Sequence, residues 1–472
     1  MILARRKLGI GFIVSPMTAR PLILVFSLAS LFYGRADDRA LSGGETTVFQ
    51  NGQNAFALPL ANITRENRRA HVIGNSFFNK NWVFAPASTS ARDGLGPLFH
   101  ARSCSECHLR DGRSAPMEGN NPLPGLLFRF GSRETEKASS HPSYGRQLAP
   151  LAMPEMRPEE EITVHYEILP GTFEDGSTYT LRKPHYELRN RVKKSTTPPS
   201  LVLSPRIAGP VFGLGLLEAI PEKLLLAGED PDDLDGDGIS GRANRVPHPE
   251  NGDIVIGRFG WKANQFDLRQ QTAAAFVDDI GITSTIHPRE DLTPNQREAY
   301  RALGLEVDAG PEVDDKTLQR VVRYLQTLAV PARRDVDDPE VVRGESLFRS
   351  LGCASCHVPQ WNTEATDPTL PEVGGQTIRP YTDLLLHDMG PDLADRRSDG
   401  EATGSEWRTP PLWGIGLTET VNGHTFFLHD GRARNLEEAI LWHGGEAEAS
   451  QNAYRGLEKK DRDALIAFLR SL

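Results

Sequence analysis

The chain contains Cys104-Ser-Glu-Cys107-His108, and the same pattern returns as Cys353-Ala-Ser-Cys356-His357. These two stretches hold all four cysteines of the sequence. In a C-x-x-C-H motif the thiols form thioether bonds to the vinyl groups of a haem, and the histidine becomes the proximal iron ligand. A zinc site needs four ligands close together, and a redox dithiol would leave both histidines unexplained. The motifs therefore predict two covalently bound haem c groups.

The first 36 residues are predicted to be a signal peptide. Basic residues precede an apolar run over residues 21–33, and Gly34-Arg35-Ala36 offers small residues, Gly34 and Ala36, at the cleavage positions. The run is too short to cross a bilayer and has the length of an export signal, although an uncleaved anchor is the competing interpretation. We expect cleavage near Asp37, with either Met1 or Met17 as the start, and a periplasmic protein without stable membrane insertion. The net charge of −10 gives no indication of nucleic-acid binding.

The remaining sequence predicts a mainly α-helical protein of two cytochrome c-type domains, 37–332 and 333–472. A short helix is expected before each motif, at residues 94–99 and 344–348, and an amphipathic helix at the end of each domain. Apolar residues at helical spacing support the latter at 318–328 and 465–472. A polar hinge at residues 331–339 marks the expected boundary.

A large insertion is predicted in the first domain, between about residues 120 and 265. Alternating apolar residues at 162–166 and 179–181 flank a turn at Asp175-Gly176 and indicate a β-hairpin. The hairpin could shield the first haem or form a substrate surface, and the sequence does not choose between these roles.

The insertion also contains a candidate calcium loop. Asp233, Asp235 and Asp237 have the spacing of D-x-D-x-D-G, in which alternating carboxylates converge on a hard cation. The twelfth position is Asn244 instead of a bidentate glutamate, so a solvated acidic turn is the alternative.

Several further motifs resemble the di-haem oxidoreductase family, whose members are described as peroxidases and as "thiol oxidoreductases". The likeness covers nearly all of the chain after the signal segment, and it extends more distantly to bacterial di-haem cytochrome c peroxidases. Thiol chemistry has no support, because the haem motifs use every cysteine. The matching stretches are 78–82, 93–99, 102–104, 213–220, 259–263, 387–390, 427–432 and 441–445.

The resemblance implies a sixth ligand for the C-terminal iron. In the di-haem peroxidases, the residue fourteen positions after the histidine of an H-x-G turn ligates this iron. Here His429-Asp-Gly431 forms the turn, and the corresponding residue is His443. Histidine in place of the peroxidases' methionine should lower the potential. Met389 is the rival ligand.

The N-terminal iron has no equally clear partner, which fits an open or displaceable site. Cleavage of peroxide also requires an acid/base group, and Glu218 in an apolar run is the candidate, with a structural role as its alternative. A tryptophan between the haems is typical of the peroxidases, and Trp261 or Trp82 could serve. Six residues are possible ligands of the first iron: Met117, His141, Met153, Met156, His165 and His185.

The expected function is reduction of hydrogen peroxide at the N-terminal haem. The C-terminal haem would receive electrons from a small redox protein and pass them on. Two alternatives remain open. One is a pure electron-transfer cytochrome, and the other is an oxidase or oxygenase that acts on an organic or protein substrate with peroxide or oxygen as oxidant.

Overall fold

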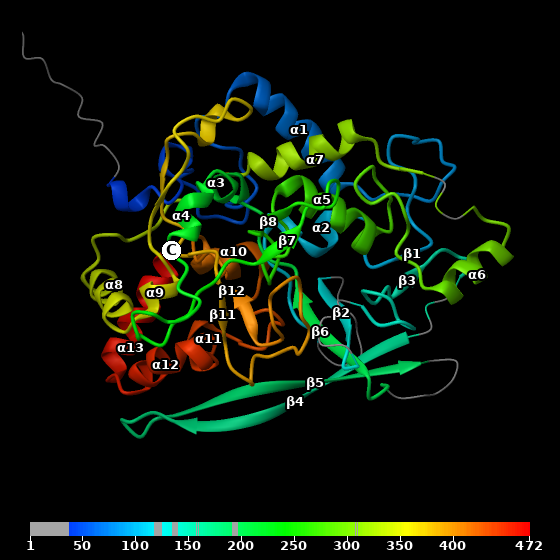
Figure 1. Ribbon diagram of the computed structural model, residues 1–472. Helices are drawn as coiled ribbons and strands as arrows, with labels where there is room; N and C mark the ends of the chain where they lie inside the picture. Colours follow the sequence, from blue (N-terminus) through cyan, green and yellow to red (C-terminus); the bar gives the residue numbers. More distant parts are fainter. Residues whose placement is uncertain are drawn as a thin grey trace, which may run out of the picture. The chain divides into compact units, whose positions relative to one another are not determined.

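The fold is mixed, so the expectation of a mainly α-helical protein is confirmed only in part. The structure, a computed structural model, describes residues 37–117, 125–134, 140–156, 158, 160–190, 197–306, 308 and 310–472. It is 31% helical and 18% strand. Most of the strand residues belong to the predicted insertion, which is longer and more β-rich than one hairpin (Figure 1). The predicted signal peptide lies outside the described residues.

In the part of the chain that the structure describes, the strands pair only two by two. The helices are α1 (Arg65–Asn79), α2 (Cys104–Cys107), α3 (Leu214–Glu218), α4 (Glu222–Leu226), α5 (Leu268–Ala275), α6 (Pro294–Ala302), α7 (Asp315–Gln326), α8 (Pro339–Ser350), α9 (Cys353–Cys356), α10 (Thr418–Asn422), α11 (Leu436–Leu441), α12 (Glu448–Arg455) and α13 (Lys459–Ser471). The antiparallel pairs are β1 (Leu98–Phe99) with β3 (Leu151–Ala152), β2 (Leu126–Ser132) with β6 (Leu201–Ile207), β4 (Glu160–Thr172) with β5 (Thr178–Asn190), β7 (Arg245–Pro247) with β8 (Ile254–Ile256), β9 (Trp361–Asn362) with β10 (Thr377–Ile378), and β11 (Leu386–Asp388) with β12 (Glu406–Arg408).

The first motif is supported by α1 and α7, which lie side by side (Figure 1). They approach closely at Gly74, where a Cβ atom would lie 2.0 Å from the carbonyl oxygen of Arg320. The apolar face predicted at 318–328 is buried, which confirms the amphipathic helix. The helix expected at 94–99 does not form. Gly96 instead packs against the backbone of Gly281, and the chain continues as strand β1.

The second motif is supported by α8 and α13 in the same way. Gly344 permits the contact, because a Cβ atom there would lie 2.0 Å from the carbonyl oxygen of Ala464. Leu465, Phe468 and Leu469 are buried against α8, so both helices predicted for this region are confirmed.

The predicted hairpin is confirmed as β4 and β5, with Val164 opposite Tyr186. Its base packs in a cluster with β2 and β6. Its tip reaches the C-terminal region, where Asp175 pairs with Arg462 at 2.9 Å and Phe173 packs beneath the same guanidinium (Figure 1). The hairpin therefore extends from the β2–β6 pair at its base to α13 at its tip.

Residues Asp37–Leu472 form one compact unit. Its two largest apolar clusters surround the two motifs, and the first cluster includes Trp413 and Leu417 from beyond the expected boundary at 332/333. Packing thus continues across the polar segment between α7 and α8. Among the described residues, no helix is both long enough and apolar enough to span a bilayer.

Candidate functional site

Each C-x-x-C-H motif opens into a cavity. The cavity at the first motif has a volume of about 300 Å³ and is lined by Cys104, Cys107 and His108. The cavity at the second has a volume of about 180 Å³ and is lined by Cys353, Cys356 and His357. The structure thus gathers each predicted haem-binding set around its own space. We refer to these as the N-terminal and C-terminal cavities.

His443, two residues after the end of α11, also lines the C-terminal cavity. Its Nδ1 donates to the carbonyl oxygen of Ala439 at 2.7 Å, and Nδ1 of His357 donates to that of Tyr381 at 3.0 Å. These bonds fix both tautomers and leave each Nε2 for a metal, an arrangement typical of metal-bound histidines. Burial lowers the pKa of His443 and brings that of His357 to about 4, so both rings are neutral at pH 7, as iron ligation requires.

The turn predicted before His443 is formed at Gly431. Its φ is +74°, and a Cβ atom there would lie 2.9 Å from the ring of Pro116, so glycine is required. The preceding His429 also lines the cavity and stacks on Trp407, with ring centres 3.9 Å apart. Burial lowers the pKa of His429 to about 4.

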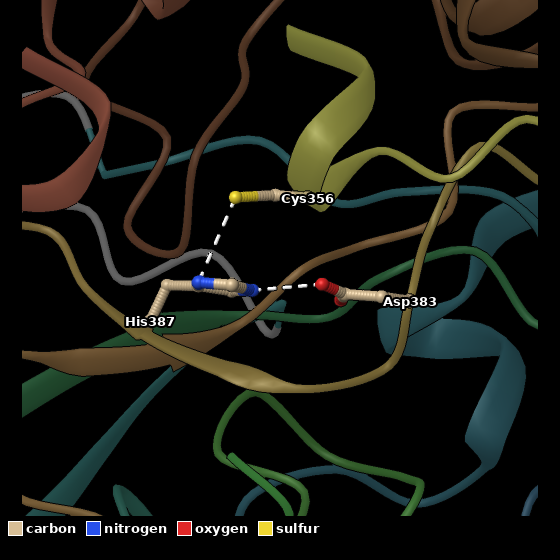
Figure 2. A group of neighbouring side chains, drawn as sticks. All are labelled: Cys356, Asp383 and His387. Carbon is tan, nitrogen blue, oxygen red and sulfur yellow. Dashed lines mark hydrogen bonds and ion pairs between the residues drawn. The ribbon is translucent and has the colours of Figure 1, made fainter. Parts of the chain in front are cut away.

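Met389, the rival ligand, lines the same cavity. It follows His387, which is held between two carboxylates: Nε2 lies 2.8 Å from Asp383, and Nδ1 lies 2.7 Å from Glu446. Burial disfavours the imidazolium, but these hydrogen bonds outweigh it and raise the pKa of His387 well above its usual value. Figure 2 shows His387 between Asp383 and the Cys356 thiol, which lies 3.6 Å from Nδ1. The carboxylates engage both ring nitrogens, so these hydrogen bonds fix the loop beside Cys356.

The N-terminal cavity has a proximal histidine but no evident second ligand. Nδ1 of His108 donates to the carbonyl oxygen of Gly209 at 2.7 Å, and burial lowers the pKa of His108. Among the described residues, no other histidine and no methionine lines this cavity. The six residues considered from the sequence lie elsewhere: Met117 is in the core beside β2, His165 and His185 stack on each other on the hairpin, and His141, Met153 and Met156 are in the surrounding loops.

A carboxylate lines the N-terminal cavity, but it is Asp279 and not Glu218. Asp279 lies in the π-helical turn η4 (Phe276–Ile280), an irregularity that is frequent at functional sites. Burial raises its pKa to about 6 against the attraction of Arg129, and Gln147 donates to its Oδ1 at 2.8 Å. Sequence reasoning missed this residue, because two adjacent aspartates at the end of an apolar helix give no distinctive signal.

Glu218 occupies a structural position at the end of α3. Its carboxylate accepts from the backbone amide of Leu268 at 2.8 Å and from the side chain of Gln326 at 2.6 Å. Burial raises its pKa, as expected for a carboxylate in apolar surroundings. Its two oxygens are nevertheless engaged by α5 and α7, outside the cavity lining.

Trp261 lines both cavities. Its indole N–H donates to the carbonyl oxygen of Ile207 at 2.8 Å, and its ring meets Trp407 edge-on with centres 6.5 Å apart. Trp82, the other candidate, is buried in the core against Phe276 and lines neither cavity. Of the two tryptophans, Trp261 alone lies between the two sites.

The acidic loop brings Asp233 and Asp235 together with Asp230 rather than with Asp237. The loop's own amides use these carboxylates, since Asp233 accepts from Gly238 at 3.1 Å. Asn244, at the twelfth position, is buried elsewhere and donates to the carbonyl oxygens of Lys262 and Asp399. Calcium binding here stays a prediction.

The chain matches the family model described as "Di-haem oxidoreductase, putative peroxidase" over residues 37–122 and 155–472. The chain therefore belongs to this family, which confirms the resemblance noted from its motifs. The matched residues include β4 and β5. No match was found among curated proteins or among solved structures. Family membership supports a general oxidoreductase function and haem as the cofactor.

Proposed function

We propose that this di-haem oxidoreductase reduces hydrogen peroxide to water in the N-terminal cavity, with electrons that arrive through the C-terminal cavity. The observation that carries the proposal is the asymmetry of the two cavities. The C-terminal cavity is lined by His443 and Met389 in addition to its motif, whereas the described lining of the N-terminal cavity offers Asp279 and no second ligand. A carrier of electrons needs two ligands on each iron, and a peroxide-reducing site needs one free position.

The residues present fit one covalently bound haem c in each cavity. Each motif places two thiols at the cavity wall. Burial raises the pKa of Cys353 to about 11 and that of Cys104 to about 12, so both thiols are protonated before haem is attached. His108 and His357, whose Nδ1 atoms donate to backbone carbonyls, would be the proximal ligands, and His443, held in the same way, would supply a further ligand in the C-terminal cavity. When bound, haem supplies an iron that changes oxidation state and binds peroxide where an axial position is free.

Asp279 would move the proton that peroxide cleavage requires. The reaction consumes two electrons and two protons for each peroxide and releases two water molecules. A carboxylate with a pKa of about 6 exchanges protons readily near neutral pH, and it can shift a proton from one peroxide oxygen to the other. Gln147 orients the group through its hydrogen bond to Oδ1.

Trp261 would couple the two cavities electronically. It contacts both spaces, and its hydrogen bond to Ile207 holds the indole in one orientation. Trp407 and the stacked His429 extend this aromatic group along the wall of the C-terminal cavity. Electrons would come from a small redox protein in the periplasm, after export by the predicted signal peptide.

The test is single-turnover oxidation of the fully reduced holoprotein by hydrogen peroxide, followed by stopped-flow absorbance. We expect one equivalent of peroxide to oxidise both haems, with the two electrons leaving one protein molecule. Oxidation no faster than that of a bis-histidine cytochrome c would contradict the proposal and leave a pure electron carrier. Rapid oxidation only in the presence of an organic substrate would indicate an oxidase or oxygenase instead.

A further inference from the structure

Two arginines, Arg113 and Arg408, line both cavities. They flank Trp261: the guanidinium carbon of Arg113 lies 5.6 Å from the centre of its ring, and Nε of Arg408 donates to the carbonyl oxygen of Gly260 at 2.9 Å. Both charges therefore lie where the two cavities come closest, beside the residue that separates them.

Neither arginine has a carboxylate partner within the part of the chain that the structure describes. The N-terminal cavity is also lined by Arg129 and Arg206, and these two are neutralised by aspartates. Arg129 pairs with Asp278 at 2.6 Å, and Arg206 pairs with Asp399 at 2.7 Å. The contrast between the two pairs of arginines indicates that the counter-charge for Arg113 and Arg408 comes from outside the chain.

The hydrogen-bonding capacity of Arg113 is also incompletely used, whereas Arg408 donates, among the described residues, only to backbone carbonyls, those of Gly260 and Thr409. Nε of Arg113 is buried without a partner, and the guanidinium contacts the carbonyl oxygen of Leu428 only at 3.5 Å. Burial lowers the pKa of both Arg113 and Arg408 to about 10, so both stay charged at neutral pH. A desolvated guanidinium without an anion is strongly unfavourable, and bidentate binding of a carboxylate removes that cost.

We propose that Arg113 and Arg408 bind the propionate carboxylates of the two haems at the junction of the cavities. The inference rests on the proposed function only in requiring haem in both cavities. Haem brings two carboxylates with it, and the planar guanidinium matches their geometry. Because each arginine lines both cavities, one side chain can contact propionates from either haem.

The arginines are then positioning residues that also set the potentials. A positive charge near a haem favours the ferrous form, which carries one positive charge fewer than the ferric form. Loss of one such charge should lower the ratio of ferrous to ferric haem roughly tenfold at a fixed potential, which is about 59 mV for one electron.

The experiment compares Arg113→Gln, Arg408→Gln and the double variant with the wild-type holoprotein. Arg258→Gln is the matched control, because Arg258 is buried, donates to the carbonyl oxygens of Glu218 and Ile220, and lines neither cavity. The haems are first counted by pyridine haemochrome assay. Spectroelectrochemical titration then gives both midpoint potentials, and resonance Raman spectroscopy follows the bending mode of the propionates.

We expect the single variants to keep two haems, to lower at least one potential and to shift the propionate band, while Arg258→Gln changes neither. Arg113→Lys should restore much of the potential, because it restores the charge.

Unchanged potentials and an unchanged band in the double variant would overturn the inference. Wild-type potentials that respond to replacing chloride by phosphate, with a constant propionate band, would instead assign the arginines to a small inorganic anion. If Arg113→Gln lost haem and Arg113→Lys kept it, the charge would still be the required feature. A wild-type protein without haem would refute the proposed function itself.

Discussion

Replacing Asp279 by Asn should slow peroxide reduction and, at neutral pH, stabilise the protein. Asparagine has the same shape and can still accept the hydrogen bond from Gln147, but it cannot exchange a proton. Loss of an acid/base group typically costs 10²–10⁴-fold in rate, which corresponds to about 3–5 kcal/mol in the activation barrier.

The stability gain follows from the pKa of Asp279. The pKa rises from 3.8 to about 6 on folding, chiefly because burial disfavours the carboxylate. This difference corresponds to a penalty of about 3 kcal/mol wherever the group is ionised in both states, which is above pH 6. Below pH 4 the group is protonated in both states and the penalty disappears. The gain for Asp279→Asn should therefore be near zero at pH 4, grow between pH 4 and 6, and stay constant above pH 6.

The assay combines stopped-flow peroxide turnover with denaturant unfolding of the holoprotein at pH 4 and pH 7.5. Glu218→Gln is the matched control, because Glu218 is a buried carboxylate whose pKa is also raised but which does not line the cavity. We expect the control to keep the wild-type rate within a few fold. Wild-type turnover in Asp279→Asn, or a stability difference that does not change with pH, would refute the reasoning. Slow turnover in Glu218→Gln alone would return the acid/base role to Glu218.

Three further predictions concern the ligand, the relay and the acidic loop. His443→Met should raise the C-terminal potential, because methionine ligation favours ferrous iron, and cyanide should still bind at the N-terminal haem. Unchanged potentials in a redox titration would make Met389 the ligand of the C-terminal iron. Trp261→Phe should keep both haems and both potentials but slow electron transfer between them in flash photolysis, and an unchanged rate would exclude a relay through the indole. Chelation should lower the Tm if Asp233, Asp235 and Asp237 bind calcium, and added calcium should restore it; a constant Tm across the titration would leave a solvated turn.

The sequence was most informative where chemistry requires fixed local spacing. The C-x-x-C-H motifs predicted which residues line each cavity, because the two thiols and the histidine of a motif lie within one turn and must face the same space. Periodicity likewise predicted α7 and α13, whose apolar faces are buried as expected. The hairpin followed from alternation and a glycine turn, since both signals depend only on neighbouring residues.

Features that depend on long-range packing were not predictable. Residues 94–99 resemble a helix start, but the close contact between Gly96 and Gly281 directs them into a strand. Glu218 and Asp279 are both acidic residues near apolar runs, and only the tertiary arrangement places Asp279 in the cavity wall. That Arg113 and Arg408 lack a carboxylate partner among the described residues is equally invisible in sequence, because it depends on which aspartates fold next to which arginines.

The most direct test of the central claim is electron paramagnetic resonance of the fully oxidised holoprotein, with the two haems assigned by His443→Met. The account predicts one low-spin haem with two axial histidines, His357 and His443, and one haem with a high-spin population that becomes low-spin when cyanide binds. The substitution should alter only the first signal. Two low-spin haems, neither of which binds cyanide in either redox state, would contradict the account and identify the protein as an electron carrier.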